Sequence, residues 1–207
     1  MLVLLEGNIA AGKTTLGEAL SNTDALAFIP EPISRWQTGF AANLLGRFYS
    51  DTPRWAFTMQ IGAFVTRAET FVNSPNAPIV VFERSIYCDR YVFAKSLHQQ
   101  GQMDETEWAL YCHFWEYLSG VVPVPDAIIY LRTPAEECYR RLKMRGRAEE
   151  KNISLDYLRQ LEVAHDEWLL APGSTPVVLL DGMQPWTAND IQQKLIRTLP
   201  QPAAENE

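Results

Sequence analysis

The chain has 207 residues, of which 47% are hydrophobic, and this suits one domain with a packed core while leaving little room for a second. Its formal net charge of -7 excludes a general attraction to nucleic acid or anionic membranes, so an anionic ligand needs a local cluster of positive charge. The three cysteines, Cys88, Cys112 and Cys138, lie far apart, which argues against disulfides and a zinc site and favours a reducing compartment. We therefore expect a cytoplasmic protein with a single domain over residues 1–207 that binds neither nucleic acid nor membranes.

Apolar runs alternate with amphipathic segments along the chain. Strands are predicted at Leu2–Glu6, Ile79–Phe82, Ala127–Leu131 and Val177–Leu180, with a weaker candidate at Ala25–Ile29. Helices are predicted at Lys13–Ser21, Trp55–Asn73, Glu105–Ser119, Ala135–Arg145 and Ser154–Leu170. Thr133-Pro134 supplies an N-cap and a helix-starting proline, Ser154 supplies another cap, and the polar segment Gln201–Glu207 is expected to fray. This alternation predicts a three-layer α/β fold with a parallel sheet, and ligands then bind at the carboxyl ends of its strands.

A glycine-rich segment follows the first strand and opens the first helix. Residues 7–14 match the pattern GxxxxGK[ST], and this strand-to-helix context is the one that a phosphate-binding P-loop requires. Its backbone N–H groups and the helix N-terminus point at phosphate oxygens, its lysine neutralises the β- and γ-phosphates, and its threonine hydroxyl ligates Mg²⁺. The residues expected to contact a bound nucleoside triphosphate are Gly7, Asn8, Ala10, Ala11, Gly12, Lys13, Thr14 and Thr15.

A P-loop alone does not define the reaction, because GTPases, ATPase motors and small-molecule kinases share it. No guanine-reading NKxD motif follows a strand, which argues against a GTPase. A chain of 207 residues with one P-loop favours a small-molecule kinase.

Further polar segments stand where the rest of such a site belongs. Glu31-Pro32 follows the weaker strand, Glu83-Arg84-Ser85 follows another, and an arginine-rich segment precedes Glu149-Glu150. With the P-loop, the segments EGNIAAGKTT, EPISRW, FERSIYCDRYVFA, RGRAEE and HDEWL resemble the deoxyribonucleoside kinase family, over most of the chain from about Leu2 to about Leu170. Within this family the resemblance is to the deoxycytidine and deoxyguanosine kinase branch.

The resemblance implies roles for the residues around the transferred phosphate. Glu31 resembles the general base that accepts the proton of a 5′-hydroxyl, Arg84 the arginine beside it, and Glu83 the acidic residue that helps to hold Mg²⁺. A cation near Glu31 would also keep its carboxylate ionised. Arg141, Arg145 and Arg147 resemble the arginines of a lid over the triphosphate, although a solvated basic face is the other interpretation of such a run.

The resemblance also implies a nucleoside pocket. Glu150 and Tyr49 resemble the residues that bind the 3′-hydroxyl, and Gln60 the amide that pairs with the base, with Trp36 and Phe93 supplying apolar and stacking surface. Surface solvation for Glu150 and core packing for Tyr49 and Trp36 are the alternatives. Asp181, after the last strand, resembles the loop near the donor's base.

Base preference is predicted from Ala63, Arg67 and Asp89. Ala63 and Arg67 lie three and seven residues after Gln60, so these three share one helix face. In the family, a small residue with such an Arg–Asp pair is typical of deoxycytidine and deoxypurine kinases rather than thymidine kinases. We therefore expect deoxycytidine, deoxyadenosine and deoxyguanosine to be preferred over thymidine, unless the Arg67–Asp89 pair is a salt bridge with no role in selection.

Two other functions stay open at this point. A nucleoside monophosphate kinase would need cations near Glu31 for the acceptor's phosphate, and Arg35 and Arg84 are the candidates. A catalytically silent structural relative should have lost Lys13, Glu31 or Arg84, yet all three are present. The expected ligands are ATP or another nucleoside triphosphate, Mg²⁺ and a deoxynucleoside, and the resemblance implies a homodimer.

Overall fold

The computed structural model describes residues 1–21, 26–173 and 175–198. Ala25 and the segment Gln201–Glu207, for which a strand start and fraying were predicted, lie outside the described residues. A five-stranded sheet has the order β2-β3-β1-β4-β5, and all four strand pairs are parallel. The strands are β1 (Leu2–Glu6), β2 (Leu26–Ile29), β3 (Ile79–Glu83), β4 (Ala127–Arg132) and β5 (Val177–Asp181). The helical elements are α1 (Lys13–Leu20), α2 (Ile33–Thr38), α3 (Leu44–Ser50), α4 (Thr52–Val72), α5 (Ile86–Cys88), the π-helical turn η1 (Asp89–Ala94), α6 (Lys95–Gln99), α7 (Glu105–Ser119), α8 (Ala135–Arg145), the 3₁₀ turn η2 (Ala148–Glu150), α9 (Leu155–Leu169) and α10 (Ala188–Thr198).

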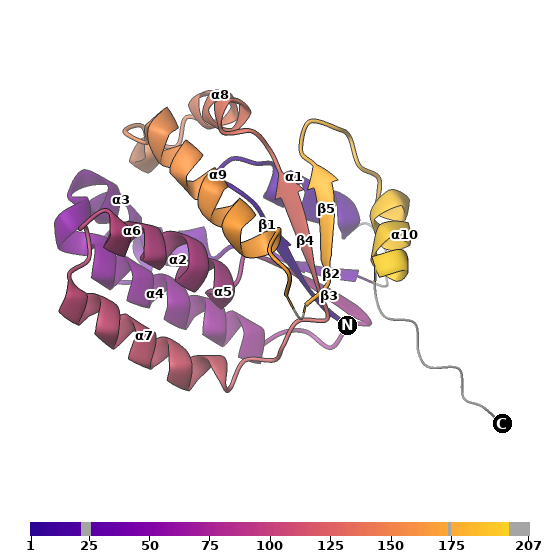
Figure 1. Cartoon of the computed structure of the whole chain (residues 1–207), viewed down its shortest axis with the longest axis horizontal. Helices are drawn as coiled ribbons and strands as arrows, with labels where there is room; N and C mark the ends of the chain where they lie inside the picture. The colour runs from indigo at the N-terminus through magenta and orange to yellow at the C-terminus, as the bar shows by residue number, and fades with distance from the viewer. Residues whose placement is uncertain (22–25, 174, 199–207) are drawn as a thin grey trace.

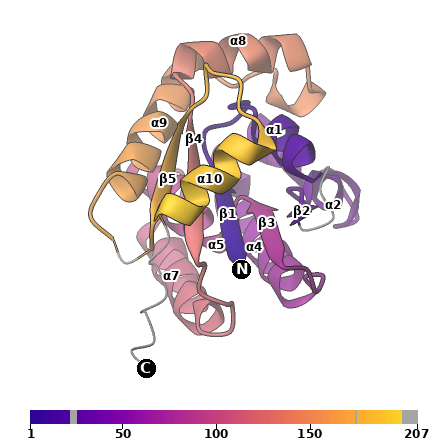
Figure 2. The same cartoon turned by 90° about the vertical axis from the view of Figure 1, so that its right-hand side faces the viewer.

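Helices cover both faces of the sheet, which gives the predicted three-layer α/β fold (Figures 1 and 2). Side chains alternate between the faces along a strand, so Val3 and Leu5 of β1 pack in one cluster with side chains of α1 and α10. Leu4 points the other way and packs in a second cluster with residues of α4 and α9. In β1, β3 and β4, whose residues are mostly buried, the runs of consecutive apolar residues are therefore explained by burial on both faces, whereas the edge strand β5 leaves Leu179 47% exposed.

The long predicted helices are all present. Of the two side-chain caps predicted at their N-termini, one is confirmed and the other is wrong. The two predictions Glu105–Ser119 and Ala135–Arg145 match α7 and α8 residue for residue, and Ser154 caps α9 by accepting a hydrogen bond from the backbone N of Tyr157. The Thr133 cap was wrong: Pro134 occupies the N-cap position of α8 without a side-chain cap. The Thr133 hydroxyl instead donates to the carbonyl oxygen of Ala11, 3.0 Å away, so this side chain binds the P-loop and does not cap the helix.

Several shorter elements had no clear sequence signal. α2 and α3 have six and seven residues, and the segment 86–99 is divided between two short α-helices and the π-helical turn η1. Such short pieces contain too few turns for a hydrophobic period to be recognised. Among the helices of the described residues, none has the length and apolar character that a membrane span requires.

The chain segments that follow β1, β2 and β3 meet at one edge of the sheet. β1 lies beside β3 with Leu5 opposite Glu83, and β2 lies on the other side of β3 with Ile29 opposite Phe82. Because the strands are parallel, the P-loop, Glu31 and Glu83-Arg84 all emerge at their carboxyl ends. This is the edge at which open α/β sheets bind ligands.

Candidate active site

The P-loop has backbone conformations that favour glycine at its turns. Gly7 and Gly12 have φ angles of 149° and 105°, and a Cβ atom on Gly7 would lie 2.5 Å from the carbonyl oxygen of Leu131. Ala10 also has a positive φ, 60°. Gly12 is the N-cap of α1, so the loop ends at a helix N-terminus, where backbone N–H groups favour an anion.

Lys13 and Thr14 follow the loop and lie in the pocket. The Lys13 Nζ donates to the carbonyl oxygens of Gly7 and Asn8 at 3.1 and 2.8 Å, and burial together with the charge of Arg84 lowers the pKa of Lys13 to about 8. The Thr14 hydroxyl donates to both carboxylate oxygens of Glu83, at 2.9 and 3.0 Å. The two residues predicted to hold Mg²⁺ therefore meet, and a hydroxyl with a carboxylate forms the hard oxygen donor set that this ion prefers.

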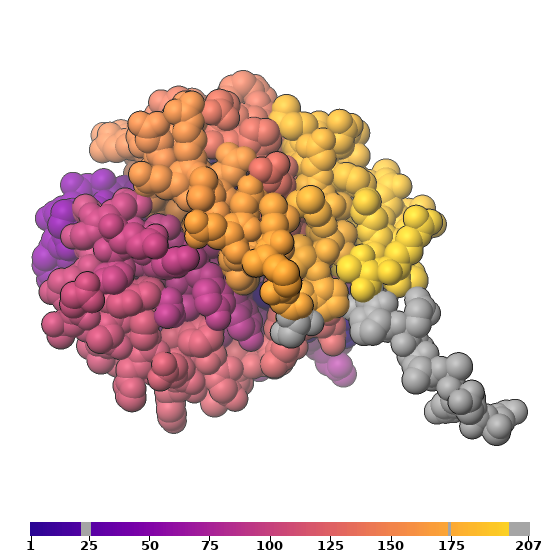
Figure 3. Space-filling view, in the orientation of Figure 1, coloured from indigo at the N-terminus to yellow at the C-terminus, as the bar shows by residue number. Residues whose placement is uncertain are grey.

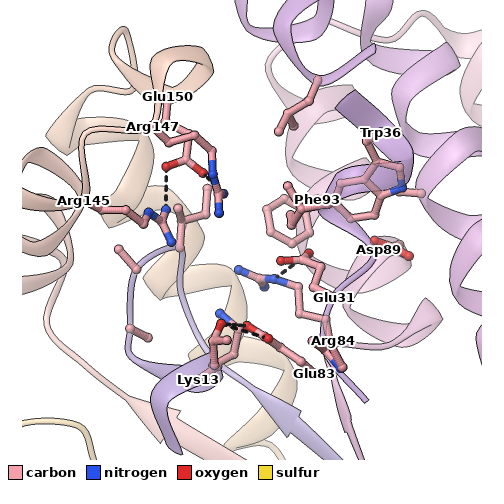
Figure 4. A pocket seen from close by; sticks show the side chains of 18 of the residues that line it. Lys13, Glu31, Trp36, Glu83, Arg84, Asp89, Phe93, Arg145, Arg147 and Glu150 are labelled. Atoms are coloured by element: carbon pink, nitrogen blue, oxygen red, sulfur yellow. Dashed lines mark hydrogen bonds and ion pairs between the residues drawn. The ribbon is translucent and has the colours of Figure 1, made fainter. Parts of the chain in front are cut away.

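On the other side of the pocket, Glu31, Arg67, Arg84 and Asp89 form a network that we call the ion-paired wall. Arg84 Nε lies 3.2 Å from a Glu31 oxygen (Figure 4). Arg67 Nη2 lies 2.7 Å from the same oxygen, and Arg67 Nε lies 2.9 Å from Asp89. Burial alone would raise the pKa of Glu31, but the charges of Arg67 and Arg84 outweigh it and lower the pKa to about 2. Glu31 is therefore an ionised carboxylate at neutral pH.

Arg67 connects two predicted parts of the site. With Asp89 it forms the pair predicted to select the nucleobase, and it also contacts Glu31, the predicted general base. Its side chain contacts Asp89 through Nε and Glu31 through Nη2, and burial raises the pKa of Asp89 to about 6 against the charge of Arg67. Arg67 is therefore more than one half of a selecting pair, because it also stabilises the charge of Glu31.

Two buried polar atoms at this end of the pocket are unused. Gln60 Oε1 and Arg67 Nη1 have no hydrogen-bond partner among the described residues. A buried polar atom without a partner costs free energy, so an acceptor and a donor remain available for a polar ligand. Gln60, Ala63 and Arg67 all line the pocket, as their shared helix face predicts.

Aromatic rings complete the wall. The Trp36 ring lies under the Arg67 guanidinium, with the Cζ atom 4.9 Å from its centroid, and the Trp36 Nε1 donates to Thr66 at 2.9 Å. The Phe93 ring lies 4.8 Å from the Cζ atom of Arg84. Trp36 is both a buried packing residue and a pocket residue, so the two interpretations of its position are compatible.

We call residues 141–150, from the end of α8 through η2, the lid. Arg145 and Arg147 both contact the buried carboxylate of Glu150, at 2.5 and 2.6 Å (Figure 4). Arg141 differs: its guanidinium donates to the carbonyl oxygens of Ala11 and Gly182 and to Glu137. Arg141 therefore braces the P-loop, while the other two arginines are paired with Glu150, and all three line the pocket.

The pocket has a volume of about 560 Å³, and most of the predicted site residues line it. These residues are Ala10, Ala11, Gly12, Lys13, Thr14, Thr15, Glu31, Trp36, Tyr49, Gln60, Ala63, Arg67, Glu83, Arg84, Asp89, Phe93, Arg141, Arg145, Arg147 and Glu150. Gly7, Asn8 and Asp181 are not on its wall. The Asn8 Nδ2 donates to the carbonyl oxygen of Leu158 in α9, and Asp181 accepts from the backbone N of Met183 in an exposed turn, so both side chains make structural contacts outside the pocket.

Other lining residues were not predicted. Met59 precedes Gln60 and points into the pocket, and its spacing of four residues from Ala63 was a signal that could have identified it. Tyr157 of α9 and the apolar side chains of Leu45 and Phe48 also line the pocket. Nothing local in the sequence distinguishes these three from ordinary core residues.

Below the P-loop lies a buried polar group that the sequence did not reveal. Glu6 accepts a hydrogen bond from Ser85, its Oε2 atom has no partner among the described residues, and burial raises its pKa to about 7. His165 has Nδ1 2.6 Å from the carbonyl oxygen of Leu161, and burial with the charge of Arg84 lowers its pKa to about 3. His165 is therefore a neutral, hydrogen-bonded helix residue.

Comparisons with known proteins agree with this geometry. The family model for deoxynucleoside kinase matches residues 3–199. The chain is 38% identical over 170 residues to the probable deoxycytidine kinase FPV151 of fowlpox virus, covering 81% of this chain and 71% of the relative. It is 36% identical over 185 residues to the mitochondrial thymidine kinase 2 of Homo sapiens, covering 87% and 70%, and 36% identical over 231 residues to deoxycytidine kinase 2 of Gallus gallus, covering 94% and 86%. These relatives are nucleoside kinase enzymes, and the chain described here belongs to the deoxynucleoside kinase family.

Proposed function

We propose that this protein transfers the γ-phosphate of ATP, or of another nucleoside triphosphate, to the 5′-hydroxyl of a deoxynucleoside. The observation that carries the proposal is the ionised carboxylate of Glu31, held by Arg67 and Arg84 in the same pocket as the P-loop lysine Lys13. A carboxylate is the group that accepts the proton of an attacking hydroxyl. Its low pKa suits phosphoryl transfer, because a loose transition state demands positioning more than a strong base.

The remaining charged groups act on the triphosphate. The P-loop N–H groups and Lys13 hold the β- and γ-phosphates, and Arg145 and Arg147 stabilise the charge that spreads over the transferred group. Thr14 and Glu83 would hold Mg²⁺, which supplies further charge neutralisation between the β- and γ-phosphates. Arg141 contributes by fixing the P-loop carbonyl of Ala11, which keeps the donor N–H groups aimed at the pocket.

We assign the deoxynucleoside base to the end of the pocket near Gln60 and Arg67. The free Gln60 Oε1 and Arg67 Nη1 offer one acceptor and one donor to a base edge, and Trp36 and Phe93 offer ring surface. The charged Arg67–Asp89 pair favours bases with an exocyclic amino group, while a thymine methyl would desolvate it without replacing its hydrogen bonds. This supports deoxycytidine, deoxyadenosine and deoxyguanosine over thymidine.

The monophosphate kinase alternative has less support. An acceptor phosphate would need a free cation near Glu31, but Arg84 is buried against Glu31, and Arg35 is paired with Glu69 at the surface and is not among the residues that line the pocket. Neither candidate cation is thus placed to receive an acceptor phosphate in this pocket. A silent structural role does not need the Lys13, Glu31 and Arg84 constellation that the pocket contains.

We also propose that the protein is a homodimer. α7 lies on the outside of the molecule (Figure 3) and exposes the large apolar side chains of Leu110, Phe114 and Tyr117. A second copy would cover this face, as apolar patches of this kind are typical of protein interfaces. The cytoplasmic location stays a prediction; one relative is named as a mitochondrial enzyme.

The test is a coupled phosphorylation assay with ATP and Mg²⁺ on deoxycytidine, deoxyadenosine, deoxyguanosine, thymidine and the matching monophosphates. We expect turnover of the first three and weak turnover of thymidine. Strong thymidine turnover would leave the reaction in place and remove the argument from Arg67 and Asp89. Turnover of monophosphates alone would replace the acceptor.

A further inference from the structure

A hydrogen-bonded link joins the lid to the opposite side of the pocket. Glu149, in η2, accepts hydrogen bonds at one carboxylate oxygen from the Nε2 of Gln37 at 2.9 Å and from the Nδ2 of Asn43 at 2.8 Å. Gln37 lies near the end of α2, and Asn43 is the N-cap of α3. Glu149 lies more than 100 residues along the chain from both Gln37 and Asn43, so the link is a tertiary contact between two separate parts of the fold.

The two ends of the link are fixed by their own neighbours. The Asn43 Oδ1 accepts from the backbone N of Gly46 at 2.7 Å, which caps α3 and leaves the Nδ2 to face the lid. The hydrogen bond from Asn43 lowers the pKa of Glu149, so its carboxylate is ionised and acts purely as an acceptor. Charge-assisted bonds of this kind hold both partners in place more firmly than neutral ones.

The link adjoins the two residues that resemble binders of the sugar 3′-hydroxyl, Glu150 and Tyr49. Glu150 directly follows Glu149, and its buried carboxylate faces the pocket (Figure 4). Tyr49 stands on α3, whose first turn is capped by Asn43. Tyr49 and Glu150 both line the pocket, and burial, followed by the charges of Tyr157 and Glu150, raises the pKa of Tyr49.

We propose that Glu149 is a positioning residue which, through Gln37 and Asn43, sets the distance between Glu150 and Tyr49 and so controls recognition of the sugar 3′-hydroxyl. The proposal rests on the proposed function, because it concerns the sugar of the acceptor. A hydroxyl is recognised by two groups only when both are held within a few tenths of an ångström of their working positions. Loss of the link should therefore weaken binding of a sugar that has a 3′-hydroxyl more than binding of one that lacks it.

The experiment compares kcat/KM for a 2′-deoxynucleoside with kcat/KM for the 2′,3′-dideoxy form of the same nucleoside. We expect Glu149→Ala to lower this ratio about threefold to tenfold, the range that one lost hydrogen bond produces. The KM for the donor should stay within about twofold of the wild-type value, because the link does not touch the P-loop. Glu136→Ala is the matched control, since Glu136 is an exposed acidic residue on α8 that pairs with Arg159 away from the pocket.

A rescue variant separates positioning from folding. Asn43→Asp keeps a good N-cap for α3 but sets a second carboxylate against Glu149, so the ratio should fall. Adding Glu149→Gln supplies an amide that can donate to that carboxylate and still accept from Gln37, so the ratio should recover.

The outcomes are distinct. A wild-type enzyme that phosphorylates no nucleoside would overturn the proposed function. A wild-type enzyme that prefers the 3′-hydroxyl, with variants that keep the full preference or lose activity on both substrates equally, would overturn the role of Glu149. A reduced ratio in both single variants, recovered in the double variant, would support it.

Discussion

The ion-paired wall and the lid each pair arginines with a glutamate, but they do so in different surroundings. The side chains of Arg67 and Arg84 at Glu31 are 4% and 3% exposed, whereas those of Arg145 and Arg147 at Glu150 are 36% and 27% exposed. Buried pairs are costly to separate, and partly exposed ones exchange readily with water or a ligand. The wall is therefore organised before the substrate binds, while the lid arginines can turn from Glu150 to phosphate.

The two regions also differ in how they are built. The wall is carried by the ends of β2 and β3, by α4 and by η1, and it is packed on both sides by the core. The lid runs from the last residues of α8, through Gly146 with a φ of 64°, to the 3₁₀ turn η2, and the Glu149 side chain links it to α2 and α3. The comparison teaches that the residues around the proposed general base are rigidly held, whereas the lid arginines proposed to stabilise phosphate are adjustable, a division that suits phosphoryl transfer.

Replacement of Glu31 should break the wall most severely. Glu31→Gln removes the proton acceptor and leaves Arg67 and Arg84 without their shared anion, so kcat should fall about 10²- to 10⁴-fold. Binding of ATP, measured by calorimetry, should stay within a few-fold of the wild-type value. A variant with normal kcat would show that Glu31 is not the base.

Replacement of Arg145 breaks the lid instead. Arg145→Ala removes one cation from the transferred phosphoryl group, and we expect kcat to fall about 10²- to 10³-fold with a smaller change in the KM of the nucleoside. Arg140→Ala is the control, because Arg140 is an exposed arginine of the same helix that pairs with Glu137. Equal losses in the two variants would mean that charge on α8 matters in general, and that Arg145 has no special role.

The buried residue Glu6 should make the free energy of unfolding depend on pH. Its pKa is about 7 in the folded protein and 4.5 as a free group, so the folded state holds this proton more tightly. The contribution of Glu6 to stability is complete below pH 4.5 and is lost as the pH rises through 7, by about 3 kcal/mol at most. Glu6→Gln stays neutral, so urea unfolding should show it gaining stability relative to the wild type between pH 5 and 8. A difference that does not change with pH would show that Glu6 is not protonated in the fold.

Selectivity gives the smallest expected effect. Arg67→Val combined with Asp89→Ala removes the charged pair, and the ratio of thymidine to deoxycytidine kcat/KM should rise about tenfold or more. Because Arg67 also contacts Glu31, overall activity should fall at the same time. Asp89→Asn, which leaves Arg67 in place, should change the ratio with a smaller loss of activity. An unchanged ratio in both variants would make the pair a structural salt bridge.

The large elements could be predicted because their signals are local. Apolar runs gave the strands, the Glu105–Ser119 pattern gave α7, and Ser154 gave the start of α9. The Thr133 cap was wrong because its hydroxyl is used by Ala11, 122 residues away in the chain, and no local pattern reveals such a partner. The short helices α2 and α3 were missed for want of length.

The same distinction holds for the site. The P-loop and the residues on one face of α4 were predicted from spacing, and they line one pocket. The contact of Arg67 with both Asp89 and Glu31, the bracing of the P-loop by Arg141 and the link from Glu149 to Asn43 could not be predicted. Each of these depends on which distant side chains the fold brings within hydrogen-bond distance.

The most direct test of the contrast between the two regions is amide hydrogen exchange, with and without deoxycytidine plus a non-hydrolysable ATP analogue. We predict that ligands strongly increase protection from exchange in the lid, residues 141–150. Protection of residues 79–89, which include Arg84 and Asp89 of the wall, should change little, because the wall is already ordered by its ion pairs. Strong new protection at residues 79–89 with an unchanged lid would contradict the account, since the acceptor site would then form only when the substrate binds.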